Sequence, residues 1–75
     1  MQRFGEKLRT LRKRDGMTLQ DLAHTLGHAD HTYLSRVETS KKPPSIELIL
    51  SIANMFGVTT DQLLKDDLEV EQDLS

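Results

Sequence analysis

The chain has 75 residues, which is enough for one compact domain and too few for a second core or a deep enclosed cleft. It contains no cysteine, which excludes disulfides and thiolate chemistry and leaves packing to hold the fold together. The net charge of −2 hides a division along the chain: residues 1–42 carry nine Lys or Arg against five Asp or Glu (+4), and residues 43–75 carry one against seven (−6). Charge alone fits both a basic binding face and an ordinary scatter of surface charge. The sequence motifs are needed to distinguish these two interpretations.

No segment is predicted to enter a membrane. The longest nearly apolar stretch, 46–58, is interrupted by polar residues and falls short of the roughly 20 apolar residues that a span needs. The N-terminal residues are charged and amphipathic from the start and do not lead into the apolar core of a secretory signal. These features predict a cytoplasmic protein.

Apolar residues at helical spacing predict two helices in the first part of the chain. The first begins near Phe4, is expected to carry its basic residues on the outside, and stops at the turn signal before Gly16. The second is short, with Thr18 placed as its N-cap and Asp21 three residues later as the partner in a capping box. Gly27 follows its last apolar residue and is expected to end it.

A third short helix is predicted after Asp30, which is placed as its cap. Its apolar residues, Leu34 and Val37, point inward at helical spacing. The residues expected on its outer face are polar: His31, Thr32, Ser35 and Arg36. Residues 39–44 end in two prolines and carry two lysines, so they predict a basic loop.

The remaining chain predicts two more helices and an acidic end. Ser45 caps the fourth helix, which closes at Gly57 in the left-handed conformation. Its predicted apolar stripe consists of Ile46, Ile49, Ile52, Ala53 and Phe56. Thr59 and Gln62 form a capping box for a fifth helix, which is followed by an acidic tail, and about the last eight residues are expected to fray. No strand alternation or internal repeat is present in the sequence, so the predicted fold is all-α.

The order of these helices, caps and loops resembles the phage-repressor-like helix-turn-helix family, often called the Xre or Cro family. The resemblance runs from about Phe4 to Leu64 and is carried by Leu22-Ala23, Gly27, Tyr33-Leu34-Ser35-Arg36-Val37-Glu38, Pro44-Ser45-Ile46 and Phe56-Gly57-Val58. It implies a lambda-repressor-like bundle of five helices in which the second and third form the helix-turn-helix. We expect this domain to span residues 1–66 and the acidic tail residues 67–75.

The resemblance also implies how the chain meets double-stranded DNA. The third helix would lie in the major groove, with His31, Thr32, Ser35 and Arg36 contacting base edges, and with Arg36 as the first choice because its planar fork matches guanine. Phosphate contacts are expected from Thr18, Gln20, Tyr33, Lys41 and Lys42. A surface ion pair of Arg36 and a purely structural Tyr33 remain open alternatives. Arg12 and Glu38 match family positions that form a structural ion pair.

In this family two modules commonly read one near-palindrome, with half-sites roughly 34 Å apart. We therefore expect a homodimer, with Met55, Val58, Leu64 and Leu68 at its interface, and with Leu48 and Val58 equally acceptable as core residues. The function implied is a sequence-specific transcription regulator, a repressor or autoregulator. The alternative is a protein-interaction module of the same fold, such as an antitoxin or adaptor.

Neither catalysis nor a cofactor is predicted. No nucleophile, base and orienting group can be assembled at sensible spacing, and there is no glycine-rich phosphate cradle, so we expect no enzyme. Three histidines, His24, His28 and His31, lie close together in sequence, but they straddle a helix end and a turn with no cysteine beside them, so no metal site is expected.

Two loops depart from the family pattern. Between Gly27 and Leu34 the chain has one residue more than the commonest turn of the family, which leaves the start of the third helix uncertain by one position. Ser40 stands where the family usually has glycine, at a site that often needs a positive φ. Because this conformation costs a serine roughly 1 kcal/mol, we expect the basic loop to be shaped differently from the family's.

Overall fold

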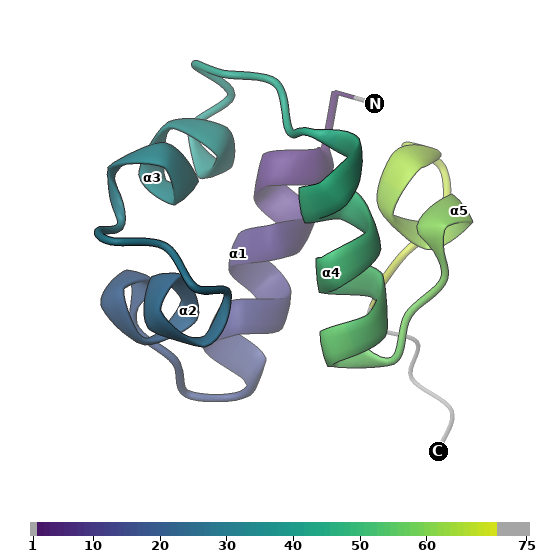
Figure 1. The fold of residues 1–75 in the computed structure, drawn as a ribbon. Helices are drawn as coiled ribbons and strands as arrows, with labels where there is room; N and C mark the ends of the chain where they lie inside the picture. The colour runs from purple at the N-terminus through teal and green to yellow at the C-terminus, as the bar shows by residue number, and fades with distance from the viewer. Residues whose placement is uncertain (1, 71–75) are drawn as a thin grey trace.

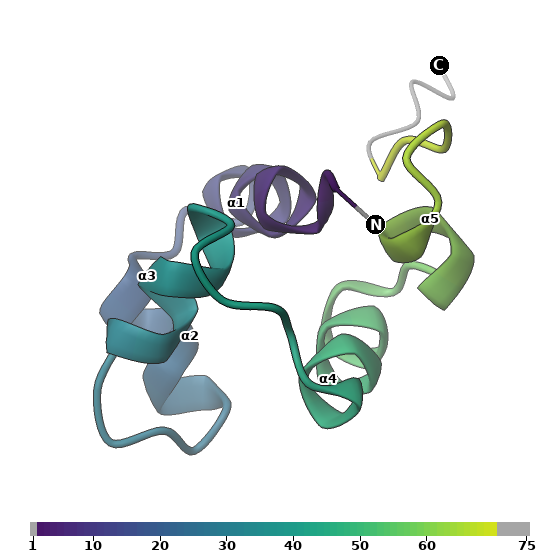
Figure 2. The same ribbon diagram turned by 90° about the horizontal axis from the view of Figure 1, so that it is seen from above.

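The computed structural model describes residues 2–70, and within that range the chain forms five α-helices and no strand. They are α1 (Phe4–Arg14), α2 (Leu19–Thr25), α3 (Thr32–Glu38), α4 (Ile46–Phe56) and α5 (Thr60–Leu64). Figures 1 and 2 show α2 and α3 grouped on one side of the molecule and α4 and α5 on the other, while α1 packs against both α3 and α5. The predicted all-helical bundle is confirmed. No helix in this range is long and apolar enough to cross a membrane.

All five helices contribute to one hydrophobic core. Apart from Val70, its members come from the inner stripe of each helix, which is why each short helix is stable only in the assembled bundle. The core side chains are Phe4, Leu8, Leu11, Leu22, Ala23, Leu34, Val37, Leu48, Ile49, Ile52, Phe56, Leu63 and Val70.

The residues predicted to cap the starts of α2 and α5 and to end α4 do so in the structure. Thr18 Oγ1 accepts the main-chain N–H of Asp21 at 3.0 Å, and the Asp21 carboxylate accepts the N–H of Thr18 in return. Thr59 and Gln62 form the same reciprocal box at the start of α5. Gly57 closes α4 with φ +68, a conformation that costs a side chain with a Cβ about 1 kcal/mol.

The start of α3 differs from the prediction by one residue. Its N-cap is His31, which makes no capping bond with its side chain. Asp30 lies one position earlier, and its Oδ1 accepts the main-chain N–H of Thr32 at 2.9 Å. The prediction of Asp30 as N-cap is therefore wrong in position, although the carboxylate still satisfies a first-turn donor.

Two side-chain placements on α4 and α1 also correct the sequence interpretation. Ile46, expected in the apolar stripe of α4, is 75% exposed, whereas Leu48 takes an inward position and is 4% exposed. On α1 the basic residues are not all outside, since Lys7 and Arg12 are buried at 1% and 9% exposure. Both cationic groups are accepted inside because each finds hydrogen-bond partners there.

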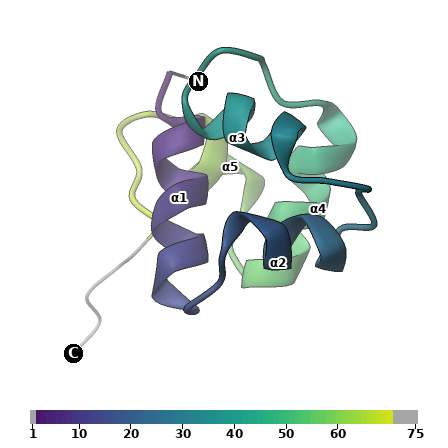
Figure 3. The ribbon, with the colours of Figure 1, turned by 90° about the vertical axis from the view of Figure 1, so that its left-hand side faces the viewer.

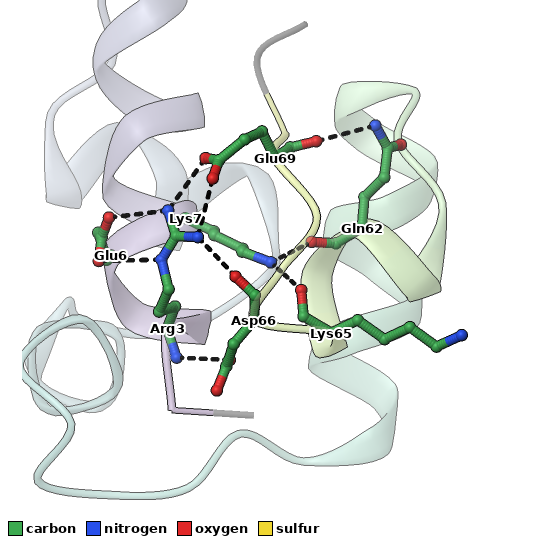
Figure 4. A network of polar contacts seen from close by, with 7 residues as sticks. All are labelled: Arg3, Glu6, Lys7, Gln62, Lys65, Asp66 and Glu69. Atoms are coloured by element: carbon green, nitrogen blue, oxygen red, sulfur yellow. Dashed lines mark hydrogen bonds and ion pairs between the residues drawn. The ribbon is translucent and has the colours of Figure 1, made fainter.

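Lys7 and Arg3 connect the two ends of the chain, as Figure 4 shows. Lys7 Nζ donates to the main-chain oxygens of Gln62 (2.6 Å) and Lys65 (2.5 Å), where the carbonyls at the end of α5 lack helical partners. At the other end, the Asp66 carboxylate accepts the N–H groups of Gln2 (3.1 Å) and Arg3 (3.0 Å) at the start of α1. Each helix end thus receives the sign of charge that its dipole favours.

Residues 65–70, which we name the C-terminal clasp, continue this connection. The Arg3 guanidinium bonds both Glu69 carboxylate oxygens, at 2.9 and 3.0 Å, and donates to the main-chain oxygen of Asp66 at 2.6 Å. Val70 is buried, with 6% of its surface exposed. The expectation that about the last eight residues fray is therefore wrong for residues 68–70, while residues 71–75 lie outside the described residues.

Candidate nucleic-acid interface

The helices α2 and α3 present one face of the molecule. Figure 3 looks onto this face and shows α3 lying above α2. The turn between them is closed by hydrogen bonds from the N–H of Gly27 to His24 O (3.1 Å) and of His28 to Ala23 O (2.8 Å), with Gly27 in the left-handed conformation at φ +80. This C-terminal motif satisfies the last carbonyls of α2 and redirects the chain into α3.

The outer side of α3 carries the four predicted base-contacting residues together. Together with Thr39 and Lys41, these four residues, His31, Thr32, Ser35 and Arg36, line an open hollow of about 310 Å³. His31, Thr32 and Arg36 are exposed, and Ser35 is half-buried. The gathering follows from the helix period, because residues three and four positions apart share a face. The surface so formed offers hydrogen-bond donors and acceptors in a concave setting.

Arg36 is available on this surface because its predicted intramolecular partners are engaged elsewhere. Glu38 pairs with Arg12 through an Nε–Oε2 distance of 2.8 Å, and Asp30 accepts the N–H of Thr32. Among residues 2–70, Arg36 takes part in no ion pair. The Arg12–Glu38 pair has the architectural place expected for it, between α1 and the end of α3.

The basic loop after α3 is tied to that helix by its main chain. Arg36 O accepts the N–H groups of both Lys41 (2.8 Å) and Lys42 (3.3 Å). This turn requires a left-handed residue, and Ser40 adopts φ +62, the conformation that glycine favours. The expectation that the serine gives this loop a different shape is therefore wrong at this position. Both lysines are exposed, and the loop holds their backbones beside the C-terminal end of α3.

Tyr33 has more structural contacts than the sequence indicated. Its hydroxyl oxygen accepts the N–H of Ser45 at 3.0 Å, and its ring stacks on His28 with centroids 5.7 Å apart. Lys42 Nζ lies 5.6 Å from the ring centroid, within the range of a cation–π contact. These contacts favour the structural interpretation of Tyr33. As an acceptor from Ser45, the hydroxyl keeps its own proton as a donor, so the phosphate contact stays a prediction.

The other predicted phosphate contacts lie at the start of α2. Thr18 and Gln20 are both exposed there. The Thr18 hydroxyl accepts the N–H of Asp21, and the Asp21 carboxylate, by accepting the N–H of Thr18, has its pKa held below the usual range. The main-chain bond from Thr32 lowers the pKa of Asp30 in the same way. Both carboxylates therefore stay ionised at neutral pH and accept main-chain N–H groups at the starts of α2 and α3.

The positive charge of the first half of the chain is unevenly available. Arg3, Lys7 and Arg12 are used inside the molecule, in the clasp and in the pair with Glu38. Beside the outer face of α3 the exposed cations are Arg36 and the two lysines of the basic loop. The count of charges in the sequence therefore overstates the basic surface. The exposed positive charge beside the outer face of α3 is concentrated toward the end of that helix and the basic loop that follows it.

Sequence reasoning missed two residues of this region. Thr39 lines the hollow and donates its hydroxyl to Ser35 O at 3.0 Å; its spacing of four from Ser35 was a usable signal. His28 packs on Tyr33 across a turn, and no pattern in the sequence indicates that contact.

The four predicted dimer residues are half-buried in the single chain. Met55, Val58 and Leu64 already pack against the core, and Leu68 lies in the clasp. Leu48, for which core and interface were equally acceptable, belongs to the core. Their partial exposure leaves the dimer surface a prediction.

Comparison with known proteins agrees with this architecture. A family model described as a helix-turn-helix domain matches residues 3–65. The chain is 37% identical over 60 residues to the HTH-type transcriptional regulator DdrOP3 of Deinococcus deserti, covering 80% of this chain and 46% of that protein. It is 36% identical over 62 residues to the prophage-derived HTH-type regulator YonR of Bacillus subtilis, covering 83% and 56%. It is 36% identical over 64 residues to the HTH-type transcriptional activator BcrR of Enterococcus faecalis, covering 85% and 31%.

The chain spans about half the length, or less, of these relatives. The matched segment runs from the N-terminal cap of α1 to the end of α5, so it includes every helix described above. The chain therefore belongs to the Xre-like helix-turn-helix domain family.

Proposed function

We propose that the chain is a sequence-specific DNA-binding domain of a transcription regulator that reads an inverted repeat as a homodimer. The observation that carries the proposal is the hollow on the outer face of α3, where His31, Thr32, Ser35 and Arg36 lie together and Lys41 stands at the rim. Side chains near the start of such a helix reach base edges in the major groove, and flanking cations meet phosphates.

Within this surface, Arg36 is proposed as the principal base contact. Its guanidinium can donate to O6 and N7 of one guanine, worth about 1–3 kcal/mol of discrimination. His31 and Thr32 stand at the first turn of α3, nearest the end that enters the groove in this kind of module. Lys41, Lys42, Thr18 and Gln20 are proposed to set the position of the domain on the phosphates.

The homodimer is proposed through the half-buried residues Met55, Val58, Leu64 and Leu68, which follow one another along the end of α4, α5 and the clasp. Two copies would place two α3 helices one helical turn of DNA apart.

The effect on transcription depends on where the bound DNA sites lie relative to a promoter. We propose that the regulator represses transcription and controls its own expression.

Selection from a random DNA pool tests the proposal. We expect an inverted repeat to be enriched, with affinity falling as salt rises. Arg36→Ala should flatten one base preference in each half-site, whereas Arg9→Ala, which removes an equal and exposed charge from α1, should not. Binding that stays in the nonspecific range of about 10⁻⁴–10⁻⁶ M for every sequence would contradict the proposal.

A protein-interaction module is the second candidate, and one observation favours it. Ile46 and Leu50 are 75% and 56% exposed and lie one turn apart on α4, so a small apolar surface faces solvent. If no DNA sequence is enriched, Leu50→Glu becomes the variant to compare with the unmodified chain in a search for a protein partner.

A further inference from the structure

Four segments of the chain meet at the ring of Tyr33. The residue itself lies in the first turn of α3, His28 stacks on it from the turn after α2, and Lys42 lies over it from the basic loop. Its hydroxyl accepts the N–H of Ser45, the N-cap of α4. Tyr33 therefore contacts the turn before α3, the basic loop after it and the start of α4.

Lys42 contacts α3 through both its main chain and its side chain, whereas Lys41 contacts α3 through its main chain. Arg36 O accepts the main-chain N–H of both lysines, so the loop backbone follows the end of α3. Only Lys42 has its ammonium over the Tyr33 ring, at 5.6 Å from the centroid. A lysine side chain otherwise has a long flexible stem, and an aromatic face that attracts the cation restricts where the charge can stand.

We propose that Tyr33 is a positioning residue that holds the ammonium of Lys42 in register with the outer face of α3, so that one phosphate contact and the base contacts are set together. This inference rests on the proposed DNA-binding function and deepens it. Tyr33 acts here through Lys42 and needs no contact of its own with DNA. The hydroxyl bond to Ser45 serves a separate task, because it supports the start of α4.

Ring electrostatics can be changed with little change of shape. Tyr33→Phe and replacement of Tyr33 by pentafluorophenylalanine both remove the hydroxyl, so they differ mainly in the charge of the ring face and slightly in the size of the ring. Fluorine withdraws electron density and removes the attraction for a cation. The readout is the slope of log K against log salt on the selected DNA site, which changes by about 0.9 for each phosphate contact.

We expect the Tyr33→Phe protein to keep the wild-type slope while losing some thermal stability, since Ser45 loses its acceptor. The fluorinated protein should show a slope shallower by about 0.9. Lys42→Ala should remove about 0.9 in the Tyr33→Phe background and nothing more in the fluorinated one. Lys41→Ala is the matched control, and its effect should be equal in both backgrounds.

Equal slopes for the phenylalanine and pentafluorophenylalanine proteins would overturn the positioning role, and so would a full effect of Lys42→Ala in the fluorinated background. In either case a wild-type protein that still selects a salt-dependent site keeps the proposed function intact. A wild-type protein that selects no site removes the proposed function itself, so the two failures are distinguishable. Circular dichroism of each variant verifies that the comparison is made between folded proteins.

Discussion

Arg12 of α1 and Glu38 at the last residue of α3 form a nearly buried, two-pronged ion pair, with Nε–Oε2 at 2.8 Å and Nη2–Oε1 at 3.2 Å. The side chains are 11% and 5% exposed, and Arg12 Nη1 also donates to Met17 O at 2.8 Å. The pair joins the N-terminal helix to the end of the proposed recognition helix and to the turn before α2. It therefore fixes the relative placement of three segments.

Replacing one member of this ion pair should lower the free energy of unfolding more than replacing both members. Glu38→Gln leaves the Arg12 guanidinium without its counter-charge in a buried site, and we expect a loss of about 3–5 kcal/mol in the free energy of unfolding. The double variant Arg12→Met with Glu38→Leu should be more stable than either single variant. Urea unfolding measures the wild type, Glu38→Gln, the single variants Arg12→Met and Glu38→Leu, and the double variant. Additive losses would show that the charges do not depend on each other.

Gly5 marks the closest approach of α1 to the end of α3. A Cβ added there would lie 2.5 Å from Glu38 O and 2.8 Å from Glu38 C, both main-chain atoms that cannot turn aside. Gly5→Ala should therefore separate the two helices and cost about 1–3 kcal/mol, even though alanine favours a helix. Arg9→Ala, at an exposed position of the same helix, should cost nothing measurable. A thermal midpoint for Gly5→Ala at or above the wild type would contradict this packing.

Ser40 is the only non-glycine residue with a positive φ within residues 2–70, at +62. Ser40→Gly should relieve this strain and stabilise the protein by about 1 kcal/mol, offset in part by the greater freedom of glycine in the unfolded chain. Thr39→Gly, one residue earlier at φ −94, should destabilise it instead. The two thermal midpoints, measured side by side, test the prediction through the sign of each shift.

The C-terminal clasp should weaken in acid. The Arg3 guanidinium lowers the pKa of Glu69 from its ordinary 4.5, and the N–H groups of Arg3 and Gln2 lower that of Asp66 from 3.8. A carboxyl group with a lowered folded pKa contributes stability that is complete above its ordinary pKa and is lost as the pH falls through the folded value. Below about pH 4 we therefore expect the amide of Leu68, which donates to Lys65 O, to lose protection against exchange relative to its intrinsic rate at the same pH.

Glu69→Gln provides the control for that experiment, because it removes one titrating group and keeps the size of the side chain. At pH 7 this variant should show weaker protection of the Leu68 amide against exchange than the wild type, and the difference in protection should narrow as the pH falls below about 4. A difference that is constant with pH would mean that the Arg3–Glu69 pair does not hold the clasp.

Interactions between residues close in sequence made much of this fold predictable. The caps at Thr18 and Asp21, at Ser45, and at Thr59 and Gln62 join residues three apart, so side-chain chemistry and helix geometry alone determine them. The outer face of α3 follows from the same local period, which is why the sequence placed its four polar residues on one surface.

The tertiary structure decided what depends on partners far away in the chain. Lys7 is buried because carbonyls of Gln62 and Lys65 receive its ammonium, and residues 67–70 are ordered because Arg3 binds Glu69. Likewise, only the packed bundle turns Leu48 inward and leaves Ile46 in solvent. No periodicity encodes such contacts, because they exist only after helices distant in sequence have been brought together and have excluded water between them.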